Sequence, residues 1–194
     1  GRAGEEAASY ENLFLRKEIA GFRTNIRREQ SCSIKSLTRD YLYKQLLSSG
    51  EYTFDHMLVI KDPYGEAPLT ALALFILEEP ACVRVTTKGN LKETDFVTEL
   101  PKKKEHRVPI LGMYAEKAND IVIEILDDEG NCVKSHTFTI RTKRLPKSLR
   151  NVITVKKWTD KPAYSNIMIN GGVKIHTCVF DIEGKIRYYL SRKP

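Results

Sequence analysis

Histidine offers this chain the widest chemistry, because neutral imidazole serves as a base and as a nucleophile near neutral pH. There are four histidines: His56, His106, His136 and His176. None belongs to a Ser-His-Asp order, and the sequence has neither a phosphate-binding loop nor a G-x-G-x-x-G run. We expect His106 to be structural, His136 structural or exposed, and His56 on the surface, with a catalytic or ligand role as the alternative for His176. No catalytic residue is predicted.

Cysteine could supply metal ligands or a disulfide. The four cysteines are Cys32, Cys82, Cys132 and Cys178, and no two of them have C-x-x-C or zinc-ribbon spacing. Cys82, Cys132 and Cys178 lie in apolar runs, which predicts buried thiols and leaves a disulfide as the alternative. We therefore predict no metal site and no cofactor.

The basic charge is a further candidate for binding. The chain of 194 residues is 41% hydrophobic and 29% charged, as in globular proteins, and its net charge is +7. Such a surface could attract nucleic acid, anionic lipid or small anions. Because the basic runs lack interleaved aromatic residues, we interpret them as solvated loops and strand edges and predict no nucleic-acid partner. The runs are Lys102–Lys104, Lys143–Arg144, Lys147, Arg150 and Lys156–Lys157.

No run of 18 apolar residues is present, so we predict no membrane span. The polar and acidic start, Gly1 to Ser9, does not resemble a signal peptide. Two locations follow from these observations: the cytoplasm, or an exported protein from which the signal has been removed.

Two helices are predicted ahead of the strands. Leu15, Ile19, Phe22 and Ile26 have helical spacing and indicate a helix from about residue 9 to 29. A second amphipathic helix, ended by Ser48-Ser49-Gly50, is indicated by a further apolar set. That set is Ile34, Leu37, Tyr41, Leu42 and Leu46. Both helices need cover for their apolar faces, from each other, from the downstream domain or from a partner subunit.

From Asp55 onward the apolar period becomes two, with turn signals between short runs. The predicted strands are 57–60, 69–77, 83–85, 108–111, 121–126, 132–141, 152–155, 174–181 and 185–190. Since no helices separate them, they favour a mainly β, antiparallel, Ig-like sandwich over a parallel α/β sheet. The expected core residues are Val59, Leu72, Leu74, Val85, Ile110, Ile123, Ile125, Phe138 and Ile140. We expect a helical segment at 1–54, a β-sandwich at 55–142 and a different C-terminal unit at 143–194.

Three runs in this order carry a family resemblance. Residues 62–71 read D-P-Y-G-E-A-P-L-T-A, a turn leading into a buried strand. Residues 106–114 read H-R-V-P-I-L-G-M-Y, and residues 119–123 read N-D-I-V-I. They resemble the N-terminal domain of bacterial aryl-sulfate sulfotransferases, whose segments read N/D-P-Y-G-x-A-P-L-T-A, H-x-I-P-V-L-G-L-Y and N-x-V-x-L. The matching positions, for which we expect structural roles, are Asp62, Pro63, Tyr64, Gly65, Pro68, His106, Pro109, Gly112 and Tyr114.

A fourth run, residues 180–190, reads F-D-I-E-G-K-I-R-Y-Y-L. It is similar to the D-x-x-G-x-I-R-W-Y-L hairpin that opens the family's β-propeller, except that Tyr188 stands where the pattern has Trp. The resemblance therefore implies that residues 143–194 are a linker and the start of a truncated propeller. A propeller blade takes roughly 40–45 residues, so six blades need on the order of 250 residues, more than this chain can hold.

The resemblance implies sulfuryl transfer from a phenolic sulfate ester to a phenol through a sulfated histidine, with no nucleotide sulfate donor. It also implies an exported or periplasmic protein. The expected role of this chain is non-catalytic packing and assembly, and its expected partner is the remaining propeller. For the C-terminal hairpin we expect either a homodimer contact or a loosely ordered terminus. The alternative function is a free-standing Ig-like module that binds a carbohydrate or a protein.

Overall fold

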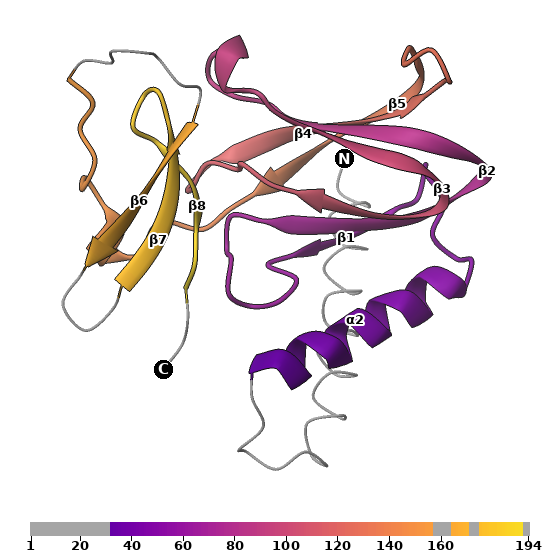
Figure 1. The fold of residues 1–194 in the computed structure, drawn as a ribbon, viewed down its shortest axis with the longest axis horizontal. Coiled ribbons are helices and arrows are strands. Elements are labelled where there is room, and N and C mark those ends of the chain that lie inside the picture. Colours follow the sequence, from indigo (N-terminus) through magenta and orange to yellow (C-terminus); the bar gives the residue numbers. More distant parts are fainter. Residues whose placement is uncertain (1–31, 157–163, 171–174, 192–194) are drawn as a thin grey trace.

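The computed structural model describes residues 32–156, 164–170 and 175–191. The helix predicted at 9–29 lies outside this described part of the chain. The described residues form one helix, two short 3-10 turns and two antiparallel sheets (Figure 1). The fold is mainly β, as the alternating sequence predicts.

The larger sheet has five strands: β1 (Leu58–Lys61), β2 (Ala71–Thr87), β3 (Phe96–Ile110), β4 (Ala118–Leu126) and β5 (Cys132–Arg141). The first half of β2 pairs with β1 and its second half with β4, while β3 pairs with both halves. Between the halves the register shifts at Ile76 and Ala81, around Pro80. An irregularity of this kind bends both strands and lets one hydrogen-bonded sheet enclose a core.

That core is filled from both halves of β2 and from the strands opposite them. Ala71, Ala73 and Phe75 from the first half share a cluster with Val83 and Val85 from the second half. Alternate residues of a strand point to opposite faces, so Leu72 and Leu74 lie on the other face. There they pack under the helix instead of inside the sandwich. The prediction that these two leucines are buried is correct, but they belong to a different layer from the rest of the predicted set.

The helix α2 (Cys32–Ser48) lies across the outer face of β1 and the first half of β2 (Figure 1). Its buried contacts are Tyr43 and Leu47, one turn apart. Leu37 and Tyr41, which the helical spacing assigns to the apolar face, are 65% and 61% exposed. The orientation differs from the prediction because Tyr43 and Leu47 provide a second apolar row, which fits the sheet. Gly50, with φ of 76°, follows the end of the helix as predicted.

The second sheet contains β6 (Tyr164–Asn170), β7 (Ile175–Asp181) and β8 (Ile186–Tyr189) and stands beside one end of the sandwich (Figure 1). Residues 142–156 lead toward it and include a short 3-10 turn at Lys147–Leu149. Cys178, Ile186 and Tyr189 from this sheet join the sandwich core cluster. The two sheets therefore share a single continuous core.

Several strand boundaries differ from the sequence prediction. Residues 69–77 and 83–85 belong to one strand rather than two, because β2 bends without ending. The first part of β3, a polar edge segment through Lys102–Lys104, carries no apolar alternation that could have revealed it. Residues 152–155 form no strand.

Within the described residues, no helix is long and apolar enough to cross a bilayer.

The burial of each cysteine follows from the position of its strand in the fold. Cys178 is buried, Cys82 is half-buried, and the three cysteines whose side chains the structure describes, Cys82, Cys132 and Cys178, are free thiols. The prediction that Cys132 is buried is wrong. Cys132 is the first residue of the edge strand β5. The first four residues of this strand are all exposed, so side chains on both of its faces contact solvent there.

Candidate functional site

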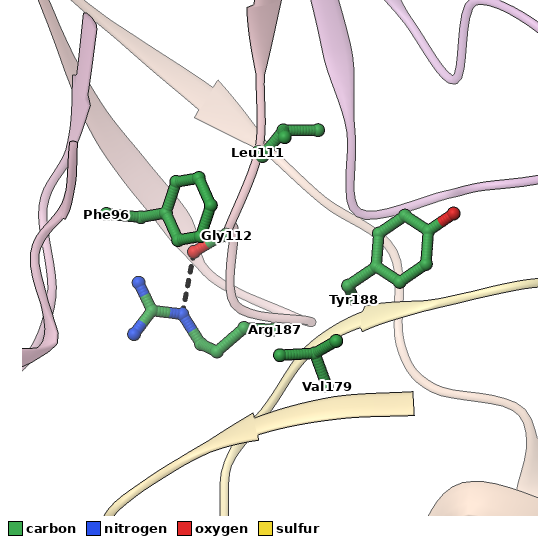
Figure 2. A pocket seen from close by; sticks show the side chains of 6 residues that line it. All are labelled: Phe96, Leu111, Gly112, Val179, Arg187 and Tyr188. Atoms are coloured by element: carbon green, nitrogen blue, oxygen red, sulfur yellow. Dashed lines mark hydrogen bonds between the residues drawn. The ribbon is translucent and has the colours of Figure 1, made fainter. Parts of the chain in front are cut away.

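The most elaborate polar arrangement in the described residues lies where the two sheets meet. Arg187 on β8 is 1% exposed, and its Nε donates to the carbonyl oxygen of Gly112 at 2.6 Å (Figure 2). Its Nη1 donates to the carbonyl oxygen of Thr94 at 3.0 Å and to Asp181 Oδ2 at 3.1 Å. Most of the directional donors of this guanidinium are thus engaged by fixed acceptors, which holds it in one orientation.

Tyr114 completes this arrangement from the sandwich side. Its hydroxyl donates to Asp181 Oδ2 at 3.1 Å and accepts from Arg187 Nη1 at 2.9 Å. It also accepts from the backbone N–H of Asn90 at 2.9 Å. The Arg187 guanidinium carbon lies 3.8 Å from the ring centroid and Lys117 Nζ lies 4.6 Å from it. Burial raises the pKa of Tyr114, so the hydroxyl remains protonated and able to donate. We call Tyr114, Asp181 and Arg187 the buried trio.

Asp181 links the trio to the turn between β7 and β8. One carboxylate oxygen accepts from Arg187 and Tyr114, while the other accepts from the N–H groups of Glu183 and Lys185 at 3.1 and 3.0 Å. The turn closes with the Gly184 N–H donating to the Asp181 carbonyl oxygen at 2.8 Å. The same side chain therefore shapes the hairpin and attaches it to the sandwich.

The loop that presents Tyr114 is fixed by Asn119 at the start of β4. Asn119 is 1% exposed; its Oδ1 accepts from the Tyr114 N–H at 2.7 Å, and its Nδ2 donates to the Tyr114 carbonyl oxygen at 3.0 Å. Gly112, two residues before Tyr114, has φ of 74°. A Cβ there would lie 2.7 Å from the Cβ of Phe96, so both the conformation and the space require glycine.

Beside the trio is a small hollow of about 150 Å³. Figure 2 shows its lining, in which sandwich and hairpin residues face one another. The lining residues are Phe96, Leu111, Gly112, Val179, Arg187 and Tyr188. Among these described lining residues there is no histidine, cysteine or serine.

The loop 62–68 forms a second polar arrangement, against α2. Tyr64 Oη donates to Asp40 Oδ1 at 2.6 Å, and Arg107 of β3 forms an ion pair with the same oxygen. Tyr43, 1% exposed, donates its hydroxyl proton to the carbonyl oxygen of Pro63. We call Asp40, Tyr64 and Arg107 the surface trio.

The other matched positions have local roles in the backbone. Asp62 Oδ1 accepts from the Ala67 N–H at 2.9 Å and so closes the loop, in which Gly65 has φ of 75°. Pro109 lies on β3, which among the described strands pairs with β2 alone, and such an edge strand tolerates a residue that lacks a backbone N–H. Pro68 is half-buried just before β2.

The histidines are placed apart from one another. His106 is 2% exposed, its ring stacks on Phe75 with centroids 5.3 Å apart, and Nε2 donates to the Lys103 carbonyl oxygen at 2.8 Å. Burial lowers the pKa of His106, so it is neutral near pH 7. His136 is half-buried between Phe54 and Phe138, and His56 is exposed. The His176 side chain lies outside the described residues.

Metal-binding geometry is absent from the described residues, since they contain no group of three or more His, Cys, Asp or Glu side chains close enough to hold an ion. Sequence reasoning missed Asp40 and Asn90, which lie in no distinctive run. It quoted Asp181 and Arg187 only as part of the hairpin motif. The signal that could have revealed them is an Asp and an Arg flanking a turn within otherwise apolar strands.

The comparisons with known proteins concern the larger sheet. No curated protein matches the chain. Residues 58–143 match the family model described as the arylsulfotransferase Ig-like domain. This range includes Tyr114, Asn119 and the loop 62–68, and it ends just after β5. The sandwich of this chain, residues 58–143, is an arylsulfotransferase N-terminal Ig-like domain.

Proposed function

We propose that this chain is the N-terminal part of an aryl-sulfate sulfotransferase and that its role is structural: the Ig-like domain holds the first strands of the following propeller. One observation carries the proposal. Three runs that resemble the family, residues 106–114, 119–123 and 180–190, meet at the buried trio. Together these runs attach the second sheet to the larger sheet.

The environments of His106 and Arg187 support a non-catalytic role for this chain. Transfer through a sulfated histidine requires an accessible imidazole and cationic donors aimed at the sulfate oxygens. His106 is enclosed and its Nε2 is engaged by a carbonyl oxygen. Arg187 is enclosed as well, with its charge directed at Asp181. In this proposal the nucleophile and its anion-binding partners belong to propeller blades other than the sheet β6–β8.

An activity assay tests this assignment. The purified chain is incubated with p-nitrophenyl sulfate and a phenol acceptor, and nitrophenol release is followed by absorbance. We expect no turnover above that of buffer. Turnover that is abolished when any one of the four histidines is replaced by alanine would contradict the proposal, because it would place the nucleophile in this chain.

The second candidate is a free-standing carbohydrate- or protein-binding module, which would use exposed aromatic residues on one sheet face. Of the described tyrosines, Tyr41 and Tyr64 are the most exposed, at 61% and 37%. They lie on α2 and on the loop 62–68, and the Tyr64 hydroxyl is engaged by Asp40. This placement favours the structural role, and a glycan-array experiment is expected to show no binding that depends on Tyr41.

A further inference from the structure

The loop 62–68 touches two parts of the molecule that are remote in sequence, α2 on one side and the end of β8 on the other. We propose that α2 and this loop form a clasp that holds β8, so that docking of the helix and order of the C-terminal sheet are coupled. The inference goes beyond the proposed function, because it concerns contacts that are independent of the sulfotransferase assignment. Tyr43 is the positioning residue of the clasp.

The helix side of the clasp is built around Tyr43. Its ring is fully enclosed and meets the ring of Tyr64 edge-on, with centroids 6.0 Å apart and an interplanar angle of 75°. Its hydroxyl donates to the carbonyl oxygen of Pro63, which is itself buried. Burial raises the pKa of Tyr43 to about 12, so this donor persists across the physiological range. The Asp40 carboxylate adds a second attachment through the Tyr64 hydroxyl.

The loop itself is held by internal hydrogen bonds. The Gly65 N–H donates to the Asp62 carbonyl oxygen at 2.9 Å, and the Thr70 N–H donates to that of Ala67 at 3.0 Å. With the Asp62 carboxylate on the Ala67 N–H, these bonds fix most of the short segment between Pro63 and Glu66. A displacement at Pro63 therefore moves Glu66 as well, because few backbone torsions between them are free to absorb it.

The β8 side of the clasp is formed at Glu66. The Ser191 N–H donates to the Glu66 carbonyl oxygen at 2.7 Å, immediately after β8 ends at Tyr189. The charged groups of the loop also contribute to the pKa of two tyrosines on β8. Burial, with the charge of Asp62 as a lesser contribution, raises the pKa of Tyr189. Burial and then the charge of Glu66 raise that of Tyr188.

Hydrogen exchange on the full chain tests the coupling with a matched pair of variants. Tyr43→Phe removes the hydroxyl that holds Pro63, and Tyr41→Phe removes a hydroxyl two residues away on the same helix that is exposed. We expect Tyr43→Phe to speed exchange of the Ser191 and Leu190 amides by about tenfold, together with those of α2. We expect Tyr41→Phe to change neither. Because coupling is reciprocal, Tyr189→Leu should speed exchange in α2.

The proposal is overturned if Tyr43→Phe accelerates α2 while Ser191 and Leu190 exchange at the parent rate. If Tyr43→Phe also speeds amide exchange in the core strand β4, the substitution has lowered the stability of the whole molecule. The coupling is then tested with the milder variant Asp40→Asn. Acceleration confined to α2, the loop and Ser191 then supports the clasp. An unchanged Ser191 amide in Asp40→Asn, with α2 accelerated, rejects it.

Discussion

The buried trio and the surface trio contain the same residue types, one Arg, one Asp and one Tyr, in two different settings. Arg187 and Asp181 have side chains that are 1% and 0% exposed, whereas those of Arg107 and Asp40 are 38% and 41% exposed. In both trios the tyrosine hydroxyl donates to the aspartate. Because the two trios contain the same chemical groups, any difference in how much they stabilise the fold reflects their different exposure to water.

The surroundings differ in how much water can replace a lost partner. An exposed ion pair contributes about 0–1 kcal/mol, because water solvates each charge when the other leaves. Removing one partner of a buried pair costs about 3–5 kcal/mol, because the remaining charge has no solvent. The buried trio therefore joins two sheets, while the surface trio adjusts how a helix docks.

The largest expected effect is that of Arg187→Met. This change leaves the Asp181 carboxylate buried without its cation, and we expect the free energy of unfolding to fall by about 3–5 kcal/mol. The matched change at the surface, Arg107→Met, should cost less than about 1 kcal/mol. Urea denaturation followed by circular dichroism measures both. Equal losses in the two variants would refute the distinction between the trios.

A smaller effect is expected when each tyrosine loses its hydroxyl. Tyr114→Phe leaves one contact of the buried Asp181 carboxylate without its donor and removes the acceptor of the partly buried Asn90 N–H, which should cost about 1–3 kcal/mol. Tyr64→Phe leaves groups that water can reach, and its expected cost is at most about 1 kcal/mol. The same denaturation experiment compares them, and a larger loss for Tyr64→Phe would reverse the assignment.

How far the sequence predicts this molecule depends on how local each signal is. The period-two runs predicted the sandwich, and the Asp127–Asn131 turn appears with Gly130 at φ of 84°, because both signals are short-range. The polar first part of β3 was missed because it has no apolar alternation of its own. It is a strand because β2 is long enough to pair with it. The face of α2 was misassigned because Tyr43 and Leu47 compete with Leu37 and Tyr41 for the sheet. The buried trio depends on pairing Tyr114 with Asp181 and Arg187, which lie 67 and 73 positions away in the sequence, and no local pattern encodes that pairing.

The smallest expected effect is a pH dependence at the surface trio. The hydrogen bond from Tyr64, followed by the hydrogen bond and charge of Arg107, lowers the pKa of Asp40 below its ordinary 3.8. The ionised form is thus favoured by the fold, so its stabilisation is complete above pH 3.8 and is lost as pH falls through the lowered pKa. Exchange of the α2 amides should accelerate there in the parent chain. In Asp40→Asn the exchange rates should lack this step, and an identical pH profile in both proteins would contradict the assignment.

A double-mutant cycle between Tyr114 and Arg187 tests the central claim most directly, because Tyr114 lies in the loop between β3 and β4 of the larger sheet and Arg187 lies on β8 of the second sheet, so the two residues meet at the junction. The parent chain, Tyr114→Phe, Arg187→Met and the double variant are unfolded in urea under one set of conditions. We predict an interaction free energy of about 1–3 kcal/mol for this pair, and a value near zero for the corresponding cycle at Tyr64 and Arg107. Additive losses at Tyr114 and Arg187, within about 0.5 kcal/mol, would contradict the claim that the Ig-like domain holds the C-terminal sheet through the buried trio.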